Sequence, residues 1–152
     1  MSRVCVVQSH HGYPVDADRL WAVAADWDAL AEANRGMVAQ YGLPGGRFRS
    51  GQKLAIEVSG FGVMPRQPYE IEILECDDAA RVMVSRERGA GIRAWNHRMW
   101  VETCPQGEGS RLHDRIEIDA GPMTPAFALW ARVLYRRRHP RRMRMLGVAG
   151  RA

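Results

Sequence analysis

The sequence of 152 residues predicts an α+β domain, in which an antiparallel sheet of about seven strands has one long C-terminal helix on one face; a sheet curved around that helix would leave a cavity between them. The first observation behind this prediction is that several segments alternate apolar and polar residues with period two, as half-buried strands do. The second observation is that the segment after the last of these strands carries its apolar residues at helical spacing. Two short helices are expected after the first strand.

The predicted first strand covers residues 3–11 and ends at the turn-forming residues 12–14. Asp16 is the expected N-cap of a first helix over about 16–25, where apolar residues recur at helical spacing. A second short helix is expected over about 27–34, because the alanine-rich segment there is followed by Asn-Arg-Gly, a typical helix stop.

The middle of the chain changes to a strand period. Strands are expected over residues 37–43, 52–59, 69–76, 81–88, 95–101 and 112–118. Residues 104–110 are rich in turn formers, so the last two of these strands are expected to form an antiparallel hairpin. Residues 60–65 are expected to form a loop with exposed apolar side chains, and Phe61 and Met64 are candidates for a mobile lid over a pocket.

The final helix has both a start signal and an interruption. Thr124 followed by Pro125 is typical of a helix N-terminus, with the threonine as N-cap and the proline in the first turn. The apolar residues that follow at helical spacing are Phe127, Trp130, Ala131 and Leu134. Pro140 lies within this pattern and predicts a kink or break near His139, because proline lacks the backbone N–H that a helix interior needs.

Composition favours a single soluble domain over residues 1–152. No apolar run approaches the ~20 residues of a membrane span, and the N-terminus lacks the features of a signal peptide. The three cysteines are an odd number without metal-ligand spacing, so a reduced, cytoplasmic protein is expected. No phosphate-binding glycine loop or dinucleotide fingerprint is present, and neither a cofactor nor a metal ion is predicted.

The 95–101 and 112–118 strands carry polar residues on their predicted buried face. Parity places His97 on the same face as Trp95 and Met99, and places Asp114 among large apolar residues of the second strand. A buried polar group costs free energy unless it is paired, so His97 and Asp114 need each other, water or a ligand. The expected registers of the hairpin place these two residues diagonally across from one another. The pattern indicates a pocket.

Further candidate pocket residues come from the neighbouring strand and from the aromatic residues. Ser85 and Glu87 share a face with Met83, whose apolar side chain indicates that this face is buried. Aromatic residues and methionines are well suited to lining adaptable apolar pockets, and they are equally suited to filling a core. The candidate ligand-binding residues are Trp95, His97, Met99, Asp114, Glu87, Ser85, Met83, Phe61, Phe127 and Trp130.

Several motifs resemble those of a known superfamily. The motifs are Pro-Val-Asp-Ala-Asp-Arg-Leu-Trp over residues 14–21, Trp95-x-His97 after a glycine turn, Leu112-x-Asp114-x-Ile116, and Tyr135-x-x-Arg138-His139. Together with the order of elements, they are similar to the START-like (SRPBCC) helix-grip proteins, in particular the polyketide cyclase/dehydrase and lipid-transport group. The resemblance implies a helix-grip fold and a ligand cavity between sheet and long helix, near Trp95, His97 and Asp114. Met99 differs from the histidine that is common at that position.

Two functions follow as hypotheses. The first is binding of a small hydrophobic or amphipathic molecule in the cavity, without catalysis. The alternative is a polyketide cyclase/dehydratase-like enzyme, in which His97 moves protons and Asp114 orients the imidazole. A buried hydrogen-bonded pair with a purely structural role would leave the same sequence pattern.

The C-terminal end, about 136–152, is rich in arginine. Seven arginines and no acidic residue lie within 136–151, while the net charge of the whole chain is +5. Such a segment could bind nucleic acid or an anionic membrane surface, but a solvated helix end, where cations oppose the helix dipole, is the commoner explanation. No nucleic-acid-binding module accompanies it, so specific nucleic-acid binding is not predicted.

Overall fold

The computed structural model describes residues 4–148. Within them the chain forms seven strands, three α-helices and one short 3₁₀ turn. In chain order these are β1 (Val4–Tyr13), α1 (Ala17–Ala24), α2 (Trp27–Ala33), β2 (Val38–Tyr41), β3 (Lys53–Gly60), β4 (Gln67–Asp77), β5 (Val82–Gly89), β6 (Ile92–Thr103), β7 (Ser110–Asp119), η1 (Gly121–Met123) and α3 (Thr124–Met145). The prediction of an α+β fold with two short helices after the first strand is confirmed. Arg3 of the predicted first strand and Arg151 of the arginine-rich end lie outside the described residues.

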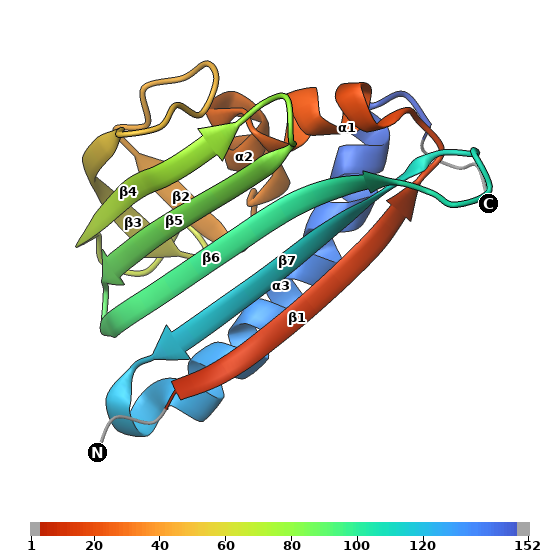
Figure 1. Ribbon diagram of the computed structural model, residues 1–152. Coiled ribbons are helices and arrows are strands. Elements are labelled where there is room, and N and C mark those ends of the chain that lie inside the picture. The colour runs from red at the N-terminus through yellow and green to blue at the C-terminus, as the bar shows by residue number, and fades with distance from the viewer. Residues whose placement is uncertain (1–3, 149–152) are drawn as a thin grey trace.

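The strands form one antiparallel sheet in the order β1-β7-β6-β5-β4-β3-β2. The strands from β2 to β7 follow one another as a meander, and β1 pairs with β7 at the opposite edge. Figure 1 shows that the sheet curls and that α3 runs diagonally across one of its faces, behind β6, β7 and β1. The two short helices lie together at one end of the sheet (Figure 1).

The strand pairing has two irregularities, both on the edges of β5. The register shifts between Ile73 and Glu75 in the β4–β5 pair, and again between Glu87 and Gly89 in the β5–β6 pair. Such bulges bend a strand and increase its local twist. Gly89 has φ +129°, and a Cβ atom there would lie 2.4 Å from the Pro68 carbonyl oxygen, so this bend requires glycine.

Side chains cap both short helices at their N-termini. The Asp16 carboxylate accepts a hydrogen bond of 2.8 Å from the Arg19 N–H, as predicted. Asp26 does the same for α2, accepting from Ala29 N–H at 2.9 Å. The two aspartates satisfy N–H groups that a helix start leaves unpaired, which fixes where α1 and α2 begin.

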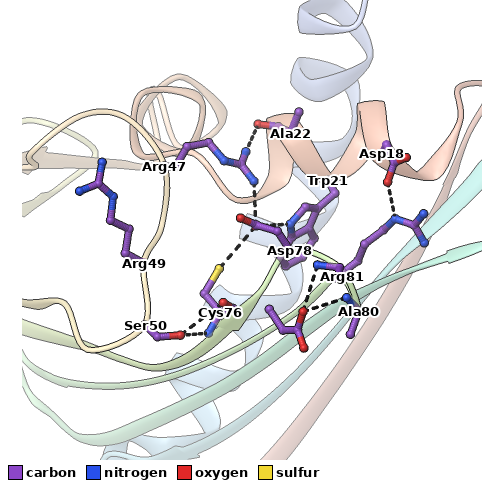
Figure 2. Close-up of polar contacts among 12 residues, drawn as sticks. Asp18, Trp21, Ala22, Arg47, Arg49, Ser50, Cys76, Asp78, Ala80 and Arg81 are labelled. Carbon is purple, nitrogen blue, oxygen red and sulfur yellow. Dashed lines mark hydrogen bonds and ion pairs between the residues drawn. The ribbon is translucent and has the colours of Figure 1, made fainter.

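A polar network joins α1 to the turn between β4 and β5. Asp78 in this turn accepts hydrogen bonds from the Trp21 indole N–H at 2.7 Å and from Arg47 at 3.1 Å, as Figure 2 shows. Arg47 also donates to the Ala22 carbonyl at 2.7 Å, and Arg81 pairs with Asp18 at 2.9 Å. The network holds α1 over one end of the sheet.

Two predictions for the last helix, Thr124 as its N-cap and a break at Pro140, were wrong. Thr124 is the first residue of α3 rather than its N-cap, because a 3₁₀ turn precedes it and Met123 takes the cap position. The Thr124 hydroxyl donates to the Gly121 carbonyl at 2.7 Å and so joins the turn to the helix. Helix α3 also runs without interruption through Pro140, where a kink or break was expected. Buried residues on both sides of the proline, Leu134 and Leu146 among them, hold the helix against the rest of the molecule.

The buried residues form two clusters. The larger one packs α1 and α2 against β3, β4 and β5, with Leu20, Trp27 and Ile73 almost fully buried. The smaller one packs α3 against β1, β6 and β7 through Ala131, Ile116 and other residues. Among the described residues, no helix combines the length and apolar character needed to span a membrane.

Candidate functional site

A cavity of about 400 Å³ lies between the sheet and α3. Its volume falls in the usual range for sites that hold small molecules. Its walls come from α2, from strands β2 to β6 and from one face of α3. The residues around it include Trp27, Leu30, Phe48, Val58, Tyr69, Ile71, Ile73, Met83, Trp95, Met99, Phe127, Trp130 and Leu134, so most of the lining is apolar.

One end of the cavity meets solvent at the loop between β3 and β4. Phe61 and Met64 line the cavity, although each is 55% exposed. The Phe61 ring stands edge-on to Trp130 of α3, with 5.0 Å between ring centroids. The loop with exposed apolar side chains was predicted, and the structure places it where it borders the cavity. Movement of the loop as a lid remains a prediction.

His97 and Asp114 form a buried pair in the wall of the cavity. His97 Nε2 lies 2.6 Å from Asp114 Oδ1, and the two residues are 7% and 3% exposed. In the hairpin, His97 is opposite Ile116 and Asp114 is opposite Met99, which is the predicted diagonal arrangement. The pair therefore satisfies two polar groups that would otherwise be costly to bury.

The charges around Asp114 set its protonation state. Burial by itself would raise the pKa of Asp114, but the hydrogen bond from His97, the charge interaction with His97 and the positive charges of Arg142 and Arg138 outweigh burial and leave this pKa below its ordinary value. Asp114 is thus ionised and accepts a hydrogen bond from the His97 Nε2–H group. In the neutral imidazole Nδ1 is then the acceptor, and within residues 4–148 it has no hydrogen-bond partner. It is available as a base or as an acceptor for a ligand.

A second polar group lies on β4 and β5. The Glu87 carboxylate accepts hydrogen bonds from the Tyr69 hydroxyl at 2.9 Å and from the Ser85 hydroxyl at 3.1 Å. All three residues line the cavity. Burial raises the pKa of Tyr69 well above its ordinary value, and the negative charge of Glu87 adds to this rise. Tyr69 therefore stays protonated and acts as a donor.

Tyr135 of α3 contacts both His97 of β6 and Arg138 of its own helix. Its ring is edge-on to the His97 imidazole at 5.6 Å, and the Arg138 guanidinium lies over the same ring at 4.3 Å from its centroid. Burial raises the pKa of the Tyr135 hydroxyl, so this group also remains neutral. Tyr135 lies between a histidine of the sheet and a cation of the helix.

Most of the predicted ligand-binding residues come together around the cavity. Those that line it are Trp95, His97, Met99, Glu87, Ser85, Met83, Phe61, Phe127 and Trp130. Asp114 is not part of the lining, because it lies behind His97 and reaches the cavity through that imidazole. In the described part of the chain, no group of three or more His, Cys, Asp or Glu side chains has the arrangement of a metal site.

Two residues of the cavity wall were not predicted. Arg138 and Arg142 were expected to belong to a solvated helix end, but they are 6% and 3% exposed and line the cavity. The expectation holds for Arg136, Arg137 and Arg144, which are exposed. Helical spacing could have predicted that these two arginines are buried. Steps of four residues beyond the apolar Leu134 reach first Arg138 and then Arg142, on the same face of α3.

Comparison with known proteins places the fold. No family model matches the sequence, and no curated protein matches it. Similar solved structures include protein CV1439 from Chromobacterium violaceum, with 12% sequence identity and a TM-score of 0.66 over 88% of this chain and 94% of that one. Ara h 8.0201 has 10% identity and a TM-score of 0.65 over 93% and 99% of the two chains. The Zhui aromatase/cyclase from a Streptomyces species has 16% identity and a TM-score of 0.63 over 95% and 92%.

At these identities the likeness shows the fold alone. The curled seven-stranded antiparallel sheet with a long C-terminal helix is the helix-grip fold of the START-like (SRPBCC) superfamily. This confirms the fold that the sequence motifs implied.

Proposed function

We propose that this chain binds a small hydrophobic or amphipathic molecule in the cavity between the sheet and α3. The observation that carries the proposal is a cavity of about 400 Å³ whose lining is mostly apolar and includes polar groups from the sheet and from α3. An apolar ligand gains about 0.8 kcal/mol for each CH₂ group it buries, and polar groups such as His97 and Tyr69 would orient one end of it. A solved structure of the same fold carries the name of an aromatase/cyclase, which agrees with use of this fold around an organic ligand.

Binding of N-phenyl-1-naphthylamine tests this proposal, because its fluorescence rises in an apolar environment. We expect saturable binding by the native chain. Leu134→Trp should weaken binding at least about tenfold, since Leu134 lines the cavity and the larger side chain occupies ligand space. Leu129→Trp is the matched control, because Leu129 lies on the same helix but is 61% exposed and should leave binding unchanged. Equal affinities of the two variants would contradict the proposal, as would an absence of binding by the native chain.

A second candidate function rests on the His97–Asp114 pair. A cavity-lining imidazole held at 2.6 Å by a buried carboxylate has the arrangement of a general base with its orienting partner. Acting on a polyketide-like substrate, His97 Nδ1 would remove a proton from carbon, and Asp114 would stabilise the imidazolium that forms. This is the cyclase/dehydratase-like alternative, and it uses the same cavity.

Substitution of His97 distinguishes catalysis from binding. If the chain is an enzyme, His97→Ala should reduce turnover of a poly-β-keto substrate about 10²- to 10⁴-fold, the usual effect of removing a general base. N-phenyl-1-naphthylamine binding by this variant should change much less. The control is His10→Ala, because His10 is exposed on β1 and does not line the cavity. Turnover that survives His97→Ala unchanged would remove the catalytic assignment and leave binding as the function.

A further inference from the structure

The face of α3 that lines the cavity changes character along its length. Its lining residues are Phe127, Trp130 and Leu134 in the first half and, after Tyr135, Arg138 and Arg142 in the second. At a rise of 1.5 Å per residue, Trp130 and Arg138 are about 12 Å apart along the helix axis. The cavity therefore has an aromatic end, which borders the exposed loop at Phe61, and a cationic end.

The two arginines at the cationic end are buried without an acidic partner. They are 6% and 3% exposed, and within residues 4–148 no carboxylate lies at ion-pair distance from either guanidinium. The other arginine side chains that pair with acids, such as Arg86 with Glu72, do so on exposed surfaces. A buried charge is strongly unfavourable unless a counter-charge or several hydrogen bonds accompany it.

The nearby carboxylates are already engaged. Asp114 is bonded to His97, and Glu87 accepts from Tyr69 and Ser85. The positive charges act on Asp114 through space, but neither arginine hydrogen-bonds to it or to Glu87 within the described residues. The Tyr13 and Tyr135 hydroxyls interact with Arg142 and Arg138, but these hydroxyls are neutral, so neither guanidinium has a counter-charge among the described residues.

Arg138 is held in a fixed position. Its Nε donates to the Asn34 side-chain Oδ1 at 2.7 Å, and the Asn34 Nδ2 donates in turn to Gln40 Oε1 at 3.0 Å. The Tyr135 ring packs under the guanidinium. Nε is the atom that bonds to Asn34, and the planar guanidinium, with its terminal Nη groups, matches the two oxygens of a carboxylate.

We propose that the ligand of this cavity is an amphipathic anion. Its oxyanion head group, such as a carboxylate, is bound by Arg138 and Arg142, and its apolar body extends toward Phe127 and Trp130. This inference rests on the proposed function and adds the chemical class of the ligand. It gives the buried arginines the counter-charge that they lack in the chain.

Two probes with the same aromatic skeleton test the proposal. They are 1-anilinonaphthalene-8-sulfonate, which carries a sulfonate, and N-phenyl-1-naphthylamine, which is the same molecule without it. Both are titrated into the native chain and into a double variant, Arg138→Met with Arg142→Met, which keeps apolar bulk at both positions. The matched control is Arg136→Met with Arg137→Met, because these arginines lie on the same helix and are exposed. Cooperative thermal unfolding shows that each variant is folded.

We expect the cavity double variant to bind the sulfonate probe at least about tenfold more weakly, while binding of the neutral probe changes less than about twofold. The exposed control should bind both probes like the native chain. The proposal is overturned if the sulfonate probe binds the cavity variant as tightly as the native chain, or if both probes weaken equally. Failure of both probes to bind the native chain would instead overturn the proposed function.

If the double variant does not fold, a measurement on the native chain alone tests whether the cavity prefers an anionic head group. Decanoate and 1-decanol, which have equal chain lengths, are compared as competitors of N-phenyl-1-naphthylamine. Decanoate should displace the probe at the lower concentration, even though the alcohol transfers more readily out of water. Displacement at the lower concentration by decanol would refute a cationic head-group site.

Discussion

At the scale of single residues, the His97–Asp114 pair shows how the sheet tolerates ionisable groups in its interior. The two side chains come from adjacent strands and meet at 2.6 Å, with Tyr135 packed edge-on to the imidazole. Replacing one member leaves the other buried without its partner, which costs more than the pair itself contributes. The pair is therefore a point where stability and function depend on the same atoms.

Asp114→Asn should destabilise the fold by about 1–3 kcal/mol at pH 7, because the amide cannot supply the negative charge opposite His97. The effect should depend on pH. The pKa of Asp114 is lower in the folded chain than its ordinary value of 3.8, so its ionised form stabilises the fold above that pH. This contribution is lost as the pH falls below 3.8. Urea denaturation across the acid range should show a steeper loss for the native chain than for the variant.

The control for this prediction is Glu75→Gln. Glu75 is an exposed acid on β4, and its replacement should leave both the stability at pH 7 and its acid dependence close to those of the native chain. An Asp114→Asn variant with the native pH profile would show that this carboxylate does not stabilise the fold by its charge.

The inward positions of His97 and Asp114 could be predicted from the sequence because strand parity is strict. A period of two assigns each side chain to a face once one apolar neighbour is placed, and the hairpin turn then limits the register to a few choices. By the same parity Trp100 lies on the opposite face from Trp95, where it stacks on His113 at 4.9 Å between ring centroids. Residue-level prediction succeeded where the geometry repeats every two residues.

At the scale of elements, α3 is both the structural cover of the sheet and the wall of the cavity. The buried face of α3 was harder to predict, because a run of arginines has no apolar residues to mark which of its positions are buried. Only the continued spacing from Leu134 separates Arg138 and Arg142 from their exposed neighbours. Pro140 was similarly misjudged, since local propensity predicted a break that packing on both sides of the proline overrides.

Pro140→Ala should stabilise the chain by about 1–2 kcal/mol. The alanine restores a helical N–H and removes the clash of the proline ring, and the greater freedom of the unfolded chain offsets part of this gain. Pro140 is exposed, so no packing is lost. Equilibrium denaturation in urea measures the change.

Pro125→Ala is the comparison for this prediction. Pro125 lies in the first turn of the same helix, where an N–H has no helical partner and proline is well tolerated. It should give no comparable gain. If both alanine variants had the same stability as the native chain, Pro140 would not strain α3.

At the scale of the whole molecule, the curled sheet and α3 leave one apolar space between them, with Phe61 at its solvent border. Phe61 makes an edge-on contact with Trp130 of α3 across this border. The loop therefore spans the opening between two elements that are distant in sequence, which a pattern within a single segment does not reveal. This is why the sequence predicted an exposed loop but not which helix it contacts.

Phe61→Ala should increase the rate at which N-phenyl-1-naphthylamine dissociates, because the ring that closes part of the opening is removed. The free energy of unfolding should change by less than about 0.5 kcal/mol, since the side chain is mostly exposed. Stopped-flow fluorescence measures the dissociation rate. Val63→Ala serves as control, because Val63 lies in the same loop, is 84% exposed and is not part of the lining. Identical dissociation rates for the two variants would exclude a gating role for Phe61.

The order of elements along the chain has a consequence for biosynthesis. All seven strands precede α3, so the apolar inner face of the sheet leaves the ribosome before the helix that covers it. Translation at about 5–20 residues per second makes the 22 residues of α3 in roughly 1–4 s. During that interval the nascent sheet is open to water and to other nascent chains, and chaperones that shield apolar surfaces would act on it then.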